Sequence, residues 1–243
     1  MHKPTVGLQV GVEMVRTVKE YDDRYTEFLD TAQTLFFTQG YEATSVQAII
    51  NVMNVSKGAF YHYFDSKTDL LEAIVFRLSE HMVSQLDDII SKSDLDVIEK
   101  LHLFFANIEN WKIDNKEAML ETGRVLLMDT NALLRSKMQE RGQQVFVPLL
   151  AQIIELGLDS KTFIVEYPLA TAQMILKMAE VISLSALPKL LASDITPADI
   201  EAIQQQIIVF NRSVELILGL EKGRLTLIEA DMLDTWFENH QSR

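Results

Sequence analysis

Apolar residues recur at intervals of three and four positions in almost every segment after Asp22, and no segment alternates strictly between apolar and polar residues. The first pattern places apolar side chains on one face of an α-helix, whereas strict alternation is typical of a half-buried strand. The sequence therefore predicts an all-α protein of about nine to ten helices.

Capping and stop signals divide the helical pattern. A first helix is expected from about Asp23 to Thr38, and Gln39-Gly40 should end it, because glycine commonly follows a helix end. A second helix is expected to begin near Thr44 or Ser45, since Thr44 and Gln47 three residues later make a capping box. Asn54 suits a left-handed turn, and Ser56 can cap a short third helix. Further helices are expected from the Ser66 capping box onward and at about 95–112, 115–128, 131–156, 168–191, 198–220 and, more weakly, 228–240.

The length of 243 residues exceeds one typical domain and suggests a small module followed by a larger one. We expect an N-terminal extension over residues 1–22, a small helical module over 23–78 and a larger helical module over 79–243. The chain shows no signal peptide pattern and no apolar run long enough for a membrane span, and it has no cysteine. These features predict a cytoplasmic protein that does not cross a membrane.

Catalytic and metal-binding patterns are missing from the sequence. It has no glycine-rich phosphate loop, no GxSxG elbow and no HExxH helix, and its five histidines are scattered. We therefore expect neither an enzyme nor a cofactor or metal site.

Residues 44–67, TSVQAIINVMNVSKGAFYHYFDSK, contain the most informative chemistry. A helix, a tight turn and a short second helix are the parts of a helix-turn-helix, whose second helix enters the major groove of DNA. Phe60 and Phe64 are four residues apart and should face inward, which leaves polar residues of the same helix to face outward.

Several outward residues have the chemistry of DNA contacts. Ala59 could touch a thymine methyl beside Gly58, and Lys57 could serve a phosphate or a guanine. Hydroxyl and ring donors can hold phosphates, and helix starts present backbone amides to them. The candidate DNA-binding residues are Thr44, Ser45, Gln47, Ser56, Lys57, Gly58, Ala59, Tyr61, His62, Tyr63 and Lys67.

The net charge of −13 argues against nucleic acid as a partner. However, the first 78 residues hold seven Lys and Arg against ten Asp and Glu, and the remainder holds 15 against 25, so −10 of the charge lies outside the small module. Binding would then depend on a few well-placed donors and helix ends, and we expect modest non-specific affinity.

Residues 25–75 resemble the DNA-binding domain of TetR-type transcriptional regulators. Seven short motifs in the same order and spacing carry this resemblance: Leu35-Phe36, Gly40-Tyr41, Thr44 to Val46, Val55 to Gly58, Phe60 to Phe64, Ser66-Lys67 and Leu70-Leu71. The resemblance implies that Gln47, Lys57, Gly58 and Ala59 approach bases, while Ser45, Tyr61, His62, Tyr63 and Lys67 hold phosphates.

Two stretches depart from the family pattern. Residues 49–54 replace an alanine-rich stretch that usually ends in glycine, and this change should alter packing. Gln47 stands where arginine is frequent, and this change should alter base preference.

The resemblance also implies that the larger module dimerises and often encloses a small effector. A homodimer is expected through helices at about 168–191 and 198–220, whose apolar arcs are wide enough to form a four-helix bundle with their symmetry mates. Candidate pocket residues are Phe104, Phe105, Asn107, Ile108, Trp111, Met119, Arg124, Met128, Phe146, Leu150, Met174 and Met178, although an ordinary core position is the simpler reading for each apolar one.

The sequence therefore predicts a bacterial DNA-binding transcriptional regulator with a palindromic double-stranded operator, and a repressor that a small hydrophobic effector releases. The alternative is a DNA-binding protein of the same fold that acts through a protein partner without an effector.

Overall fold

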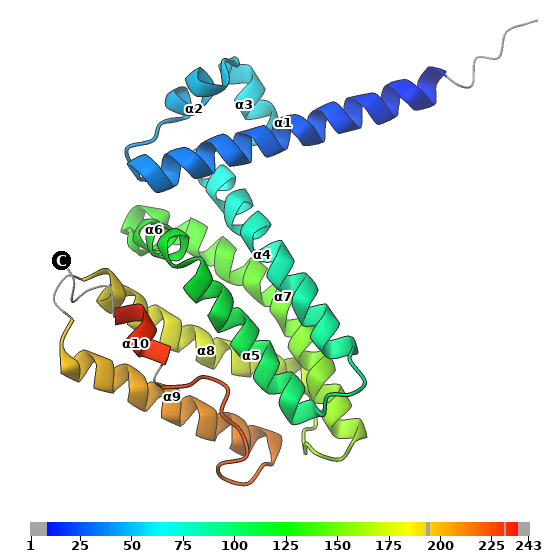
Figure 1. Ribbon diagram of the computed structural model, residues 1–243, viewed down its shortest axis with the longest axis vertical. Helices are drawn as coiled ribbons and strands as arrows, with labels where there is room; N and C mark the ends of the chain where they lie inside the picture. Colours follow the sequence, from blue (N-terminus) through cyan, green and yellow to red (C-terminus); the bar gives the residue numbers. More distant parts are fainter. Residues whose placement is uncertain (1–8, 193–194, 231, 238–243) are drawn as a thin grey trace, which may run out of the picture. The chain divides into compact units, whose positions relative to one another are not determined.

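The computed structural model describes residues 9–192, 195–230 and 232–237, and within these residues it contains only helices, turns and loops. The helices are α1 (Gln9–Gln39), α2 (Val46–Met53), α3 (Lys57–Tyr63), α4 (Lys67–Ser91), α5 (Val97–Asp114), α6 (Lys116–Leu127), the short 3₁₀ helix η1 (Asp129–Asn131), α7 (Ala132–Asp159), α8 (Pro168–Leu191), α9 (Pro197–Leu218) and α10 (Met232–Phe237) (Figure 1). The predicted all-α class is confirmed. The chain divides into two compact units, Met1–Leu78 and Ser79–Arg243.

The first helix is longer than the sequence predicted. α1 begins at Gln9, whereas the expected start was near Asp23 and residues 1–22 were expected to precede the helix. No proline interrupts Gln9–Gln39, so nothing in this segment forces a helix boundary. Gly40 follows the helix with φ of 88°, in the left-handed region that glycine adopts without strain. Residues 1–8 of the expected extension lie outside the described residues.

The helix-turn-helix is formed by local side-chain hydrogen bonds. The Ser45 hydroxyl accepts from Ala48 N at 3.1 Å and caps α2, and the Ser56 hydroxyl accepts from Ala59 N at 3.2 Å and caps α3. Between them, Asn54 lies in the left-handed conformation with φ 53° and ψ 46°. The predictions for Asn54 and Ser56 are confirmed, but α2 is capped by Ser45 and not by Thr44.

Aromatic rings anchor α3 to α1. The Phe60 ring is fully buried and packs edge-on against Phe28, with 5.8 Å between ring centroids. The Phe64 ring stacks on Tyr25 with 5.1 Å between centroids and meets Phe28 at 5.9 Å. Both α3 phenylalanines therefore face inward, as the sequence predicted, and the opposite side of this short helix is left to solvent.

In the second unit, α8 packs between α7 and α9, and α5 also packs against α7 (Figure 1). The segment after α9 folds back onto that helix, because Asn211 donates to Ile228 O at 2.9 Å and accepts from Leu227 N at 3.0 Å. Leu225, Leu227 and Ile228 are thereby buried in the core.

Lys100 is a buried cation on α5, and the residue is only 5% exposed. Its ammonium donates to Ile90 O and Lys92 O, both at 2.5 Å, at the carboxyl end of α4. A cation at this end donates to carbonyls that have no partner within the helix, and it interacts favourably with the negative end of the helix dipole. Lys100 therefore fixes the end of α4 against α5.

Among the residues that the structure describes, no helix combines the length and the apolarity that a bilayer crossing requires.

Candidate DNA-binding surface and ligand cavity

The outer face of α3 lies on the side of the helix opposite the inward Phe60. Lys57, Gly58, Tyr61 and His62 are exposed, and Ala59 and Tyr63 are half-buried. The Lys57 ammonium lies 5.9 Å from the centroid of the Tyr61 ring, so the two side chains lie near one another on the exposed surface. We define the α3 outer face as Lys57, Gly58, Ala59, Tyr61 and His62.

Nothing within the chain requires glycine at position 58. A methyl group built at this position would meet only the Ser56 hydroxyl, at 3.8 Å, which is an ordinary contact. Gly58 also has no positive φ. Neither packing nor backbone conformation within the chain therefore requires the missing side chain, and the requirement would have to come from a molecule that approaches this helix closely.

α2 contributes a second set of exposed polar groups. Ser45 and Gln47 are both exposed, and the Gln47 amide donates to Asn51 Oδ1 at 2.8 Å. This bond links two residues one turn apart and leaves the Gln47 carbonyl oxygen available. The exposed start of α2 and the α3 outer face together hold most of the predicted DNA-binding residues.

Two predicted residues differ from this arrangement. The Thr44 side chain is fully buried, and its hydroxyl donates to Gly40 O at 2.9 Å, so it does not face outward. The Lys67 ammonium is half-buried and donates to Tyr41 O at 2.8 Å and to Thr44 O at 3.0 Å. Two of its three protons are thus used inside the unit, and these contacts hold the loop before α2 against the start of α4.

Burial affects the ionisation of the groups around this loop. Burial, together with the charges of Glu42 and Asp69, raises the pKa of Tyr41 well above its ordinary value. Burial lowers the pKa of Lys67, and the nearby carboxylate of Glu42 opposes that shift. The Lys67 ammonium also lies 4.0 Å from the centroid of the Tyr41 ring. The cation is therefore held by carbonyls and a ring face.

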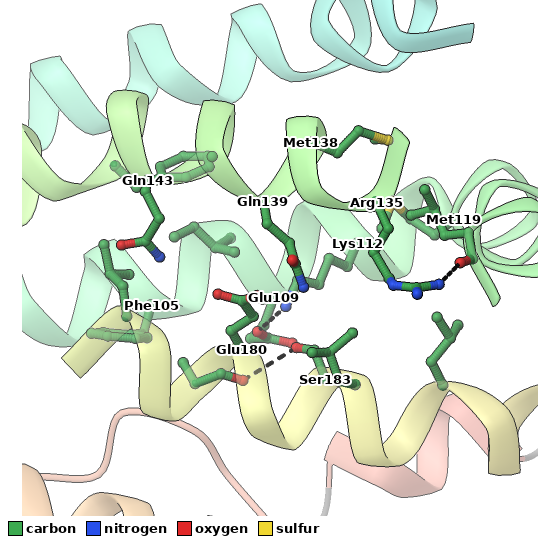
Figure 2. Close-up of a pocket in the computed structure, with 18 of the residues that line it drawn as sticks. Phe105, Glu109, Lys112, Met119, Arg135, Met138, Gln139, Gln143, Glu180 and Ser183 are labelled. Atoms are coloured by element: carbon green, nitrogen blue, oxygen red, sulfur yellow. Dashed lines mark hydrogen bonds and ion pairs between the residues drawn. The ribbon is translucent and has the colours of Figure 1, made fainter. Parts of the chain in front are cut away.

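The second unit contains a cavity of about 340 Å³ among α5, α6, α7 and α8 (Figure 2). Its wall is mainly apolar, with a few charged and amide side chains. The lining residues are Phe105, Ile108, Glu109, Lys112, Met119, Leu126, Leu127, Arg135, Met138, Gln139, Gly142, Gln143, Phe146, Leu176, Ala179, Glu180, Ser183, Leu184 and Leu187. Of the predicted pocket residues, Phe105, Ile108, Met119 and Phe146 line this cavity.

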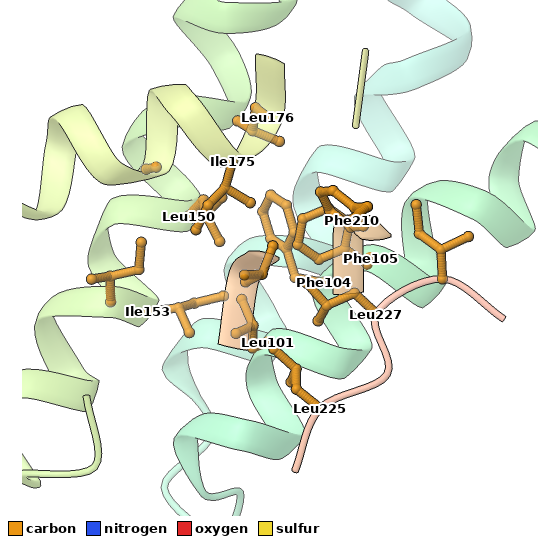
Figure 3. Packing of buried hydrophobic residues seen from close by; sticks show 14 of the residues in the cluster. Leu101, Phe104, Phe105, Leu150, Ile153, Ile175, Leu176, Phe210, Leu225 and Leu227 are labelled. Atoms are coloured by element: carbon orange, nitrogen blue, oxygen red, sulfur yellow. The ribbon is translucent and has the colours of Figure 1, made fainter. Parts of the chain in front are cut away.

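The other predicted pocket residues lie elsewhere. Phe104 and Leu150 are fully buried in the core of the second unit (Figure 3), and Met178 packs against that core. Met174 and Met128 are exposed, at 61% and 39%. None of these apolar side chains lines the cavity. The spacing of apolar residues along a helix is the same for core, cavity and surface positions, so it could not separate them.

The predicted polar pocket residues are engaged outside the cavity. Asn107 donates to Gln85 Oε1 at 2.9 Å, and Arg124 is exposed and pairs with Glu121 at 3.4 Å. Trp111 is half-buried and is not among the lining residues. The sequence reading instead missed Arg135, Gln139 and Gln143, which are four residues apart and therefore share one face of α7. That spacing was the available signal, but a polar face of a helix normally meets solvent.

The described segments contain no group of three or more His, Asp or Glu side chains close enough to hold a metal ion.

A protein-family model matches the part of the chain that contains the helix-turn-helix. Residues 28–74 match the model described as bacterial regulatory proteins, tetR family, and this range contains α2, α3 and the Phe28 ring that packs against Phe60. Residues 28–74 therefore form a DNA-binding domain of the tetR type. The resemblance inferred from the seven motifs is thereby confirmed for this part of the chain.

Two curated relatives extend the comparison beyond the matched domain. An uncharacterized HTH-type transcriptional regulator of Bacillus subtilis (strain 168), YxaF, is 30% identical over 128 residues, which is 51% of this chain and 64% of the relative. The HTH-type transcriptional repressor KstR2 of Rhodococcus jostii (strain RHA1) is 36% identical over 73 residues, which is 30% of this chain and 35% of the relative. The chain thus spans less than two thirds of the length of either protein.

A solved structure shares the fold over most of the chain. The TetR-family transcriptional regulator from Pectobacterium atrosepticum superposes with a TM-score of 0.55 at 20% identity, over 82% of this chain and 96% of that protein. At this identity the likeness supports the fold of both units and nothing finer.

Proposed function

We propose that this chain is a sequence-specific, DNA-binding transcriptional regulator that acts as a homodimer and as a repressor. KstR2 is named as a repressor, and this name supports the same direction of control here. The α3 outer face would enter the major groove, while Ser45 and the start of α2 would meet the backbone.

The observation that carries this proposal is the division of α3 into two faces. Phe60 and Phe64 are 0% and 4% exposed and hold the helix from behind, whereas Tyr61 is 48% exposed on the other side. A recognition helix needs this combination, because its position must be fixed while its polar groups remain free for bases and phosphates.

The homodimer is supported by apolar side chains that α8 and α9 leave uncovered. Met174 and Val181 are each 61% exposed and lie seven residues apart on α8, and Val209 and Leu216 have the same spacing on α9 with 63% and 61% exposed. Seven residues are close to two helical turns, so each pair lies on one face. We define this α8–α9 apolar face by these four residues.

An apolar face of this kind is typical of a surface that is covered in the assembled protein. Ile175, Ile182, Ile207 and Phe210 of the same two helices are instead buried within the chain. The exposed residues of the α8–α9 apolar face are therefore the ones that a partner copy would cover.

The cavity among α5 to α8 favours a small effector over a protein partner as the regulatory signal. Its volume of about 340 Å³ falls in the range of small-molecule sites, which is roughly 300–1,000 Å³. α4 carries the chain from the first unit into the second, so a ligand in the second unit could change the operator-binding state through it by the ~1–3 kcal/mol typical of allosteric coupling.

Selection of genomic fragments by the purified protein tests the DNA-binding function. We expect enrichment of a palindromic sequence, and Lys57→Ala should reduce the slope of log affinity against log salt concentration by about 1, because one phosphate or guanine contact is lost. Tyr61→Phe removes only a hydroxyl and should weaken binding about tenfold or less. Retained selection by a chain in which both residues are replaced by alanine would contradict the assignment of the α3 outer face.

Sedimentation of a charged variant tests the dimer. Val181→Glu combined with Val209→Glu places carboxylates on the α8–α9 apolar face and should convert the dimer to monomer, with loss of operator binding. Gln144→Glu, an exposed position on α7, is the matched control and should remain dimeric. A double variant that stays dimeric would place the interface elsewhere.

A further inference from the structure

The cavity in the second unit has a polar stripe along one wall. Arg135, Gln139 and Gln143 project from the same side of α7 toward α5 and α8 (Figure 2). Eight residues of helix separate the first from the last, which corresponds to about 12 Å at 1.5 Å per residue. The stripe is therefore long enough to distinguish the two ends of an elongated molecule.

The charged groups around the cavity are not equally paired. Lys112 and Glu109 form an ion pair at 2.6 Å, and Glu180 pairs with Lys177 at 2.7 Å. Arg135 has no carboxylate partner in the described part of the chain; its Nη1 donates to Leu126 O at 2.5 Å. A guanidinium carries five N–H donors, so most of those of Arg135 remain unused. Arg135 is thus the cavity cation whose charge is not balanced by a neighbour.

The far end of the stripe has an acceptor without a partner. Gln143 Oε1 is buried and forms no hydrogen bond in the structure. A buried polar atom without a hydrogen bond is uncommon, because nearly all buried polar atoms in folded proteins are paired. Together with the unbalanced Arg135, it indicates that this wall is completed by another molecule.

The walls that α5 and α8 form opposite the stripe carry apolar side chains beside Glu109, Lys112, Glu180 and Ser183. The apolar ones are Ile108 and Phe105 of α5 and Leu176, Leu184 and Leu187 of α8. An aliphatic chain would bury apolar surface there, at roughly 25 cal/mol for each Å² removed from water. A strongly polar ligand would gain little from these apolar side chains.

We infer that the cavity takes an elongated amphipathic organic anion, whose carboxylate lies against Arg135, whose apolar chain packs against the apolar side chains of α5 and α8, and whose far end donates a hydrogen bond to Gln143 Oε1. This inference rests on the proposed role of the cavity as an effector site. A neutral ligand of the same length would leave the guanidinium desolvated without a counter-charge, which is unfavourable, and a cationic ligand would be repelled.

Three probes with the same chain and different head groups test this inference. Decanoate, decan-1-ol and decylamine are titrated into the full-length protein by calorimetry. A hydrogen bond to a charged group contributes ~1.5–3 kcal/mol, so we expect decanoate to bind about 10- to 100-fold more tightly than decan-1-ol, and decylamine to bind most weakly. Equal affinities for decanoate and decan-1-ol would overturn the inference.

Variants of Arg135 locate the head group. Arg135→Gln should remove the preference for decanoate while changing decan-1-ol binding by less than about threefold, whereas Arg135→Lys should keep most of the preference because it keeps the charge. Arg124→Gln on α6 is the control, because that side chain is 64% exposed and does not line the cavity. Unchanged decanoate affinity in Arg135→Gln would assign the anion to another cation and overturn the inference.

A parallel operator titration without any probe separates this inference from the proposed function. If the ligand-free protein binds its selected operator but none of the probes binds the protein, the ligand class is wrong and the DNA-binding function stands. If decanoate binds through Arg135 but no DNA fragment is selected, the ligand class stands and the regulatory function is wrong.

Discussion

The two units of this chain differ in where their candidate functional residues lie. In the first unit they lie on an outer surface, over a core in which Phe28, Phe36 and Phe60 are fully buried. In the second unit they lie around a cavity and on an exposed helical face, next to a large core of their own. Apolar residues of the second unit therefore lie in three kinds of place, the core, the cavity wall and the exposed face, whereas the large apolar side chains of the first unit lie mainly in its core.

This difference decides how each unit can be interpreted. On α3, the large apolar side chain of Phe60 faces inward and the polar side chains of Lys57 and His62 face outward, so residue type indicates the position of the large side chains. On α8, Ile175 is buried, Leu176 borders the cavity and Met174 is exposed, although all three are apolar neighbours. Substitutions in the core of one unit should therefore affect that unit and not the other.

Removal of the Phe60 ring should have the largest effect. Phe60→Ala leaves a cavity against Phe28 and should lower the free energy of unfolding of the first unit by about 3–5 kcal/mol. Amide hydrogen exchange read helix by helix should show faster exchange in α1 to α3 and unchanged exchange in α7 to α9. Val52→Ala is the control, since Val52 is 65% exposed and its truncation should change stability by less than about 0.5 kcal/mol.

If α7 to α9 also exchange faster in Phe60→Ala, the two units unfold as one cooperative body, and their stabilities are not independent.

A methyl group at Gly157 should destabilise the second unit. A Cβ built there lies 1.9 Å from Cδ2 of Phe163, whose side chain is 3% exposed and has little room to move. Gly157→Ala should therefore cost about 1–3 kcal/mol. Gly142→Ala is a matched change on the same helix with no atom within 4 Å of the new Cβ, and it should stabilise α7 by roughly 0.5–1 kcal/mol. Thermal unfolding that shows the same sign for both would contradict this.

Much of the fold and of the first site could be predicted from the sequence. Helical periodicity and capping residues predict each α-helix of the described residues, although α1 begins at Gln9 and not near Asp23, and Asn54, Ser56, Phe60 and Phe64 lie as expected. Thr44 was misplaced because Thr and Ser are nearly equivalent as caps, and only the turn of the chain decides which of two neighbours faces inward.

The cavity could be predicted only in part, for a physical reason. Phe104 and Phe105 are adjacent apolar residues on α5, but only Phe105 reaches the cavity, and the choice depends on how neighbouring helices pack. Arg135 and Gln143 have the spacing of an ordinary solvent-facing stripe, so their inward position follows from the tertiary arrangement and not from residue type. Cavities are set by what packing leaves unfilled, which no local pattern records.

A methyl group at Gly58 should separate stability from function in the first unit. Glycine is less favourable than alanine within a helix, and the position has space, so Gly58→Ala should raise the free energy of unfolding by up to about 0.5–1 kcal/mol. Operator affinity should nevertheless fall about tenfold or more, because the methyl group would hold the α3 backbone away from base edges. Gly142→Ala, the same substitution in the second unit, should leave affinity for the operator unchanged.

A gain in stability without a loss of operator affinity in Gly58→Ala would mean that the missing side chain has no role in close approach to DNA.

Lowering the pH should reduce the stability of the second unit more than that of the first, with a smaller effect than the substitutions above. In the first unit the shifted groups described above are Tyr41 and Lys67, which titrate in alkaline solution, whereas Asp199 and Glu215 on α9 have lowered pKa values. For Asp199, hydrogen bonds from Lys189 and from the hydroxyl and amide of Thr196 lower the pKa to about 2. For Glu215, burial raises the pKa, but hydrogen bonds from Arg212 and from the backbone of 223–225 outweigh burial and lower it.

A carboxyl group with a lowered pKa stabilises the folded state above its unfolded pKa, near 3.9 for Asp, and that contribution is lost as pH falls through the folded value. Asp199→Asn should therefore lower the melting temperature of the second unit slightly at pH 7, and the difference from the unaltered chain should shrink between about pH 4 and 2. Lys189→Met removes the largest cause of the shift and should move this loss to higher pH. A difference that persists unchanged down to pH 2 would mean that Asp199 acts as a neutral helix cap, and acid would then not discriminate α9 from the helices of the first unit.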